Sequence, residues 1–171
     1  MTGSLPLFAA YDGATISPCG LYRYVLRRQW GPRPPVNFIL LNPSTADAIK
    51  PDPTMTRCMN YARAWDKDGI VITNLFAFRS SEPRDLRSAL DPIGPQNDLD
   101  LITSAHNSCL IVCGWGADPF AEDQARKVKG MLRERGYANK THVLRLTKSG
   151  APGHPLYLPK NLTPQVWDLG V

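Results

Sequence analysis

The fold is decided by the stretch FILLNPSTAD at residues 38–47, where an apolar run ends abruptly in polar residues. A run of bulky apolar residues is typical of a buried strand, and Asn42-Pro43-Ser44 is typical of the turn that follows one. In open α/β folds, ligands bind beyond the carboxyl ends of the strands. We therefore expect a functional site at this loop, with Asn42 at its centre.

Similar apolar runs recur along the chain, with helix-like segments between them. They cover residues 36–41, 69–74, 109–115 and 142–146. Continuous Val, Ile and Leu runs without polar alternation are expected of parallel strands that are covered on both faces. The pattern predicts an α/β protein: a three-layer α/β/α sandwich with a central, mostly parallel sheet of at least four strands.

Proline and capping residues predict where the helices begin. Asp52-Pro53 and Asp118-Pro119 each combine an N-cap with a proline at the first helical position, and the second helix ends near Gly136. A further helix is expected over residues 97–106, and a short helical turn over residues 84–90.

The N-terminal region is more difficult to interpret. Residues 21–30 alternate as in a strand, although a helix is the alternative, and we place an edge strand there. We treat residues 1–171 as a single domain in which residues 1–35 form an N-terminal extension.

Composition narrows the choice of partners. A net charge of +5 and a pI near 9.2 favour an anionic partner, either nucleic acid, with DNA preferred, or a nucleotide. No apolar stretch approaches the ~20 residues of a membrane span, and no secretory signal begins the chain. We expect a cytoplasmic monomer that does not contact a membrane. The four cysteines form no C-x-x-C pair, so no metal is predicted, and no cofactor is predicted either.

The expected strand ends bring amides, a histidine and aromatic residues to one rim. Asn42 follows the first core strand, Asn74 ends the second, and His154 lies in the loop after the last. A planar amide offers donors and an acceptor that suit the edge of a nucleobase, and an aromatic ring supplies a stacking surface. This set of residues favours recognition of a base.

The order of these motifs resembles the uracil-DNA glycosylase superfamily. LLNPS at residues 40–44 looks like the Asn-Pro loop that positions the attacking water, and VITN at 71–74 looks like the strand whose Asn reads the base. CGWGA at 113–117 is similar to the Trp-Gly strand. GHPL at 153–156 is similar to the His-Pro loop that inserts into DNA and stabilises the departing base.

A second resemblance covers residues 22–167, nearly the whole domain. The motifs LNPSTAD, DPTxxRC, NLFAFR, DPIGPxND, WG and HPLYLP are similar to those of a bacterial and phage family of unknown function.

The glycosylase resemblance implies a nucleic-acid N-glycosidase that cleaves the bond between an altered base and its sugar through a water held by an Asn. Its implied catalytic residues are Asn42 and His154. The implied base-binding residues are Asn74, Phe76, Ser44 and Thr45; the implied contacts to the nucleic-acid backbone are Arg57, Arg79 and Lys148; and the implied DNA wedge is Leu156 and Tyr157.

Simpler interpretations stay open for each of these residues. Asn42 is also suited to an Asx turn before Pro43, Phe76 to core packing, and Tyr157 to packing on the C-terminal tail. The final loop departs from the family pattern because it reads His-Pro-Leu-Tyr, which leaves the identity of the base open. Two other functions remain: a non-catalytic module that binds a nucleobase or nucleotide, and a hydrolase of free nucleosides or nucleotides.

Overall fold

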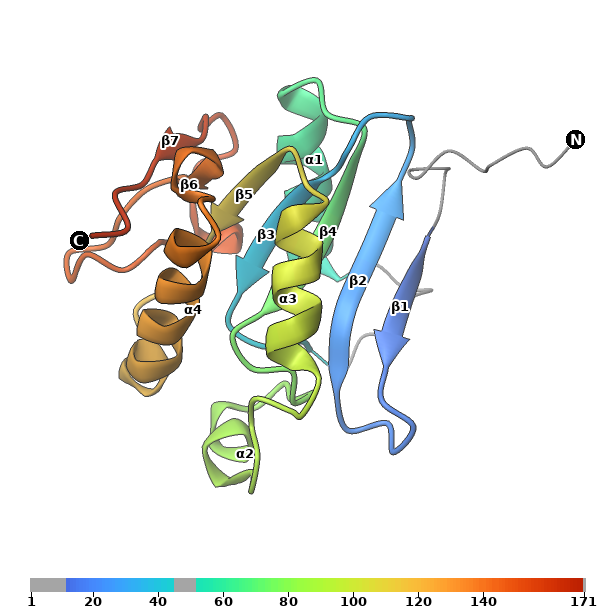
Figure 1. Cartoon of the computed structure of the whole chain (residues 1–171), viewed down its shortest axis with the longest axis vertical. Helices are drawn as coiled ribbons and strands as arrows, with labels where there is room; N and C mark the ends of the chain where they lie inside the picture. Colours follow the sequence, from blue (N-terminus) through green and yellow to red (C-terminus); the bar gives the residue numbers. More distant parts are fainter. Residues whose placement is uncertain (1–11, 45–51, 171) are drawn as a thin grey trace, which may run out of the picture.

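The computed structural model describes residues 12–44 and 52–170, which form a seven-stranded sheet with helices on both faces (Figure 1). The strands lie in the order β1-β2-β4-β3-β5-β6-β7. Four neighbouring strands are parallel: β4 (Gly69–Asn74), β3 (Val36–Leu40), β5 (Leu110–Cys113) and β6 (Thr141–Val143). This confirms the expected α/β class with a mostly parallel centre.

The outer strands are antiparallel and change one prediction. The strand expected within residues 21–30 is present as β2 (Arg23–Gln29), but its placement at the edge of the sheet is wrong. β1 (Gly13–Ile16) pairs with the outer edge of β2. The turn between the two strands contains Gly20, which adopts a φ of 76°. On the other side, β7 (Gln165–Val166) pairs with β6. Both additional strands are short and lack an apolar run, which is why the sequence pattern did not predict them.

The helices begin close to the predicted positions. The Asp52 side chain accepts a hydrogen bond of 2.7 Å from the Met55 backbone N–H and caps α1 (Pro53–Ala64). The helices α2 (Pro83–Ser88) and α3 (Asn97–His106) follow. Asp118-Pro119 begins a separate 3-10 turn, η1 (Pro119–Ala121), and α4 (Glu122–Glu134) continues from it.

The sheet separates two buried clusters because alternate residues of each strand point to opposite faces. Phe38 and Ile72 pack with Met55 and Tyr61 of α1 on one face. The other face is covered by α3 and α4, and its cluster includes Ile39 (Figure 1). All five residues of β3 are buried, as expected for a strand covered on both sides.

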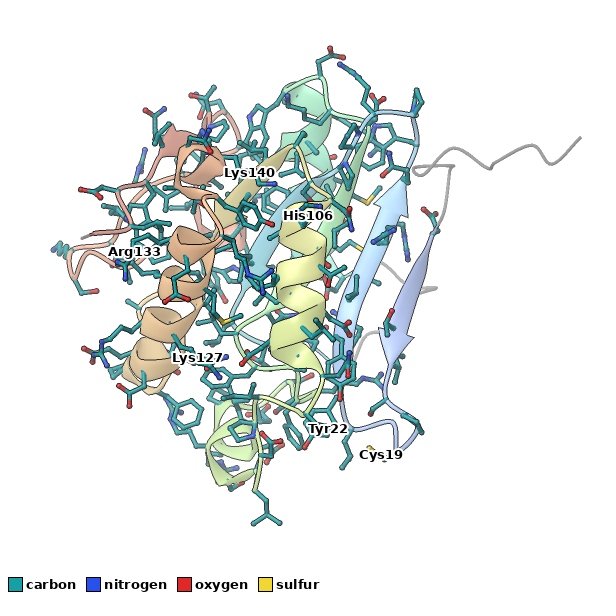
Figure 2. All side chains as sticks on the ribbon, viewed as in Figure 1. Cys19, Tyr22, His106, Lys127, Arg133 and Lys140 are labelled. Atoms are coloured by element: carbon teal, nitrogen blue, oxygen red, sulfur yellow. The ribbon has the colours of Figure 1, made fainter. Side chains whose placement is uncertain are left out.

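The C-terminal end of α3 lies at the amino ends of the parallel strands. Figure 2 shows Lys140 and His106 in this region, away from α2. The Lys140 ammonium, at the end of η2 (Ala138–Lys140), donates to the backbone oxygens of Ala105, His106 and Ser108 at 2.7, 3.3 and 3.0 Å. These bonds place a positive charge at the carbonyl groups around the C-terminal end of α3. The N-termini of α1 and α4, in contrast, lie at the carboxyl rim of the strands, where the candidate site is found.

Candidate functional site

Asn42 follows β3 with its amide group held in place. Its Nδ2 donates to the backbone oxygens of Pro43 and Ser80, at 3.1 and 2.9 Å. The Ser80 backbone N–H donates in turn to the Pro43 oxygen at 3.1 Å, so the two loops are joined. Both amide hydrogens are therefore used, and Oδ1 has no hydrogen-bond partner within the described part of the chain. This oxygen is available to accept a hydrogen bond from a water or a ligand.

Asn74 ends β4 beside Leu40 of β3. Ile70 and Ile72 belong to the cluster on the α1 face, so the alternation of the strand places Asn74 on the same face. The residue is 2% exposed, and its buried Oδ1 accepts no hydrogen bond from any residue that the structure describes. Such a buried acceptor costs about 1–3 kcal/mol unless a donor reaches it. A ligand N–H would supply that donor only after the residues that enclose Oδ1 move aside.

Asp52 connects the first loop to the rest of the site. In addition to capping α1, its carboxylate accepts a hydrogen bond of 2.8 Å from the Ser44 Oγ. Its negative charge also opposes the effect of burial on the pKa of both Arg23 and His154. Asp52 therefore lies close to two residues that are distant in the sequence, and we call the set of Asn42, Asp52, Asn74 and His154 the α1-side site.

His154 precedes the 3-10 turn η3 (Pro155–Tyr157), and its ring caps that turn. The Leu156 backbone N–H donates to Nδ1 at 3.2 Å. Nδ1 is therefore the unprotonated nitrogen, and Nε2 carries the hydrogen of the neutral ring. Burial lowers the pKa of His154, and the nearby Asp52 opposes this shift only in part. The geometry gives a neutral imidazole with an N–H donor.

Helix α1 holds the loop that carries His154. The Arg57 guanidinium donates to the Pro155 and Leu158 oxygens at 3.3 and 2.6 Å. One turn further on, the Tyr61 hydroxyl donates to the Pro159 oxygen at 2.5 Å. The predicted contact of Arg57 with a phosphate stays a prediction; in the structure its Nη1 fixes the loop beside His154.

Arg23 is a site residue that the sequence analysis did not select. Its side chain is 3% exposed, and burial lowers its pKa while Asp52 opposes the shift. The charge of Arg79 lowers the pKa of Arg23 further, so the two guanidinium groups lie near each other. Arg79 also donates to the Gly20 oxygen at 3.2 Å. Arg23 is one of three arginines in β2, and no signal in the sequence distinguishes it from Arg27 and Arg28.

Other predicted site residues lie elsewhere. Phe76 is 3% exposed and belongs to the core cluster on the opposite face of the sheet, where its ring lies 5.0 Å from that of Phe120. It is not brought to the α1-side site, because it lies beyond the end of β4, where the chain has crossed to the α3 and α4 face. Lys148 is exposed in the turn at residues 147–150. Thr45 lies outside the described residues.

The two proposed wedge residues follow His154 directly. Leu156 is half-buried, whereas Tyr157 is 82% exposed. The Tyr157 ring lies 5.5 Å from the His154 ring. An exposed aromatic side chain beside a half-buried histidine is positioned to contact a ligand that enters the site.

The described residues contain no group of three or more His, Cys, Asp or Glu side chains that could hold a metal ion. Over the same part of the chain, no helix has both the length and the apolar character that crossing a membrane requires.

Comparisons with known proteins give a family but no activity. No curated protein and no solved structure matches the chain. The family described as "Protein of unknown function (DUF1643)" matches residues 23–156, which include β2 to β6 and His154. The chain therefore belongs to the DUF1643 family.

Proposed function

We propose that this protein is a base-directed N-glycosidase that removes an altered base from nucleic acid. The observation that carries the proposal is the fixed amide of Asn42, whose Nδ2 is used by the Pro43 and Ser80 oxygens and whose Oδ1 has no partner among the described residues. A nucleobase presents ring and exocyclic N–H groups that satisfy an amide oxygen. A protein can contact these groups once the base has flipped out of the stacked bases of the nucleic acid. The motif order that resembles the uracil-DNA glycosylase superfamily supports the same conclusion.

The reaction replaces the bond between the sugar carbon and the base nitrogen with a bond from that carbon to a water oxygen. Positive charge develops on the sugar and negative charge on the departing base. Asn42 Oδ1 accepts a hydrogen bond from the water and orients it, and the proton leaves to solvent as the new bond forms. The His154 Nε2–H donates to the base where negative charge gathers. Asp52 supplies a negative charge nearby that favours the cationic sugar.

A neutral histidine suits this task. An imidazolium ring would donate from both nitrogens and would lose the hydrogen bond that Nδ1 accepts from the Leu156 N–H. The burial that lowers the pKa of His154 keeps the ring neutral and its donor fixed. Asn74 then selects the base, whereas Asn42 and His154 act on the bond that breaks.

Two other functions each have an observation in their favour. The fixed amide of Asn42 is also what a non-catalytic nucleobase-binding module would use. The two hydrogen bonds from Arg57 Nη1 to backbone oxygens leave this guanidinium fewer donors for a phosphate, which favours free nucleosides as substrates. Both alternatives use the same residues to recognise the base.

The test is base release from oligonucleotides that carry uracil, hypoxanthine or another altered base, as single and double strands, with alkaline cleavage at the abasic sites. We expect Asn42→Ala and His154→Gln to reduce the rate on the order of 10²–10³-fold. Asn60→Ala and His106→Gln are matched controls, because both residues are exposed and lie outside the site. Base binding without release from any substrate would exclude the glycosidase and favour the module, and release from mononucleosides alone would favour the nucleoside hydrolase.

A further inference from the structure

A second cavity lies at the same rim but on the α4 face of the sheet. Its volume is about 510 Å³, within the usual range of small-molecule sites. We call it the tryptophan pocket, and the residues that define it here are Trp115, Gly116, Lys129, Gly150 and Trp167. Trp115 follows β5, Lys129 belongs to α4, and Trp167 follows β7 directly. None of these residues belongs to the α1-side site.

The two indole rings of the pocket lack the hydrogen bonds that the other tryptophans make. The Nε1 groups of Trp30 and Trp65 donate to backbone oxygens at 2.9 and 3.1 Å. Trp115 is only 4% exposed, and its Nε1 has no acceptor within the described part of the chain. The Nε1 atom of Trp115 is not one of the enclosed atoms, so it keeps some access to solvent. Trp115 lines the cavity, so part of its ring is available to a ligand there.

Lys129 supplies the positive charge of the pocket. Its ammonium lies 4.8 Å from the centre of the Trp167 ring, and the ring centres of Trp167 and Trp115 are 5.6 Å apart. The other charged groups of the pocket have partners: Asp118 pairs with Arg87 at 2.8 Å, and Arg126 pairs with Asp123 at 2.9 Å. Lys129 forms no ion pair with any residue that the structure describes.

The backbone around the cavity is held by a hydrogen bond, and two of its glycines have free space beside them. The Gly116 N–H donates to the Pro152 oxygen at 2.8 Å and joins the end of β5 to the loop before His154. Gly116 and Gly150 have φ angles of 81° and 82°, which glycine adopts without strain. A Cβ at either position would have nothing within 4 Å. The space is therefore held open by the fold and is not closed by neighbouring side chains.

We propose that the tryptophan pocket binds one nucleotide, with its phosphate at Lys129 and its base against the indoles. A lysine without an ion-pair partner among the described residues is suited to an oxyanion, and the tryptophan rings are suited to a flat, partly polar ring. A nucleotide combines both chemistries in a molecule of this size. The nucleotide is either free or part of a strand. The inference concerns a site distinct from the α1-side site and does not depend on base release.

Titration calorimetry, supported by tryptophan fluorescence, tests the proposal. The probes are UMP and AMP, the corresponding nucleosides, inorganic phosphate, and a short single-stranded oligonucleotide. Lys129→Met removes the charge and retains an apolar side chain over Trp167, and it should weaken nucleotide binding on the order of tenfold. Lys127→Met is the matched control, because Lys127 lies two residues away on α4 and pairs with Asp98 of α3 (Figure 2).

Each outcome decides a specific part of the proposal. Binding of mononucleotides that Lys129→Met weakens and Lys127→Met does not would support it. The same pattern with the oligonucleotide alone would support a nucleotide within a strand. Binding of phosphate as tight as that of nucleotide, or no binding of either nucleotide form, would overturn it. The glycosidase proposal is tested by base release and this one by nucleotide binding, so failure of either would be seen separately.

Discussion

The two faces of the rim use polar groups in different ways. On the α1 face, Asn74 and Arg23 are almost fully buried, and Asp52 has its position set by two hydrogen bonds at 2.7 and 2.8 Å. On the α4 face, a cavity of about 510 Å³ is bordered by indole rings and a lysine. The first region is preorganised, which favours chemistry on one bond. The second leaves room, which favours binding of a whole ligand.

Adjacent residues at the end of β5 separate the two regions. Gly114 lies close to Pro155 and Leu40, and therefore to the α1-side site. Trp115, the next residue, packs against Trp167 on the other face. Because neighbouring residues in extended chain point to opposite faces, one strand end contributes to both regions without linking their side chains.

The largest effect on stability is expected from Gly114→Ala. The added Cβ would lie 2.8 Å from Pro155 Cδ and 3.3 Å from Leu40 Cδ2, so the loop that carries His154 must move. We expect a loss of about 1–3 kcal/mol in the free energy of unfolding, measured in urea. Base release should fall while nucleotide binding in the tryptophan pocket is retained. Gly130→Ala in α4 is the control, since its Cβ meets nothing within 4 Å. An equal loss at both regions would show that they are not separate.

Tyr61→Phe should have the next largest effect, and only on the α1 face. Tyr61 is 1% exposed, and its hydroxyl donates to the Pro159 oxygen. Removing the donor leaves a backbone oxygen without its partner, which costs about 1–2 kcal/mol in unfolding free energy. Tyr157→Phe, at an 82% exposed position, serves as the control and should change stability by less than about 0.5 kcal/mol. Equal stability of wild type and Tyr61→Phe would contradict the role of α1 in fixing the loop.

The pH dependence of stability should report on the α1-side site. Burial lowers the pKa of His154 below the ordinary 6.5, so the unfolded chain binds a proton at a higher pH than the folded chain. The contribution of His154 to stability is therefore complete above about pH 6.5 and decreases as the pH falls below it. The slope from one residue cannot exceed about 1.4 kcal/mol per pH unit. Urea unfolding between pH 5 and 8 should show that the free energy of unfolding changes less steeply with pH for His154→Gln than for wild type. Equal slopes for the two proteins would contradict this prediction.

Arg126→Ala should change stability least, although Arg126 borders the tryptophan pocket. Its pairs with Glu122 and Asp123 are 3.5 and 2.9 Å long, and all three side chains are at least 69% exposed. Exposed pairs contribute about 0–1 kcal/mol, and salt weakens them further. We expect the unfolding midpoint in urea to shift by no more than the error of the measurement. A clear loss of stability would mean that the α4 face is preorganised as well.

Sequence patterns predicted the framework of the site better than its side chains. They indicated the strand that ends at Asn74 and the cap at Asp52 at the residues where the structure has them. They did not indicate that Asp52 lies close to both Arg23 and His154, because that proximity arises only when β2, α1 and the final loop pack together. Phe76 illustrates the opposite error, since its position after a strand gave no information about which face its ring would occupy.

The sequence by itself determined the buried parallel strands and the starts of the helices. Continuous apolar runs can be satisfied only by burial on both faces, and Asp-Pro pairs cap helices through bonds to nearby residues. Only the tertiary structure decided that Asn74 is a buried acceptor without a donor among the described residues, that Arg57 holds the loop beside His154, and that two tryptophans border a cavity. These features depend on contacts between residues far apart in the chain. Local preferences fix the elements, whereas packing fixes which side chains meet.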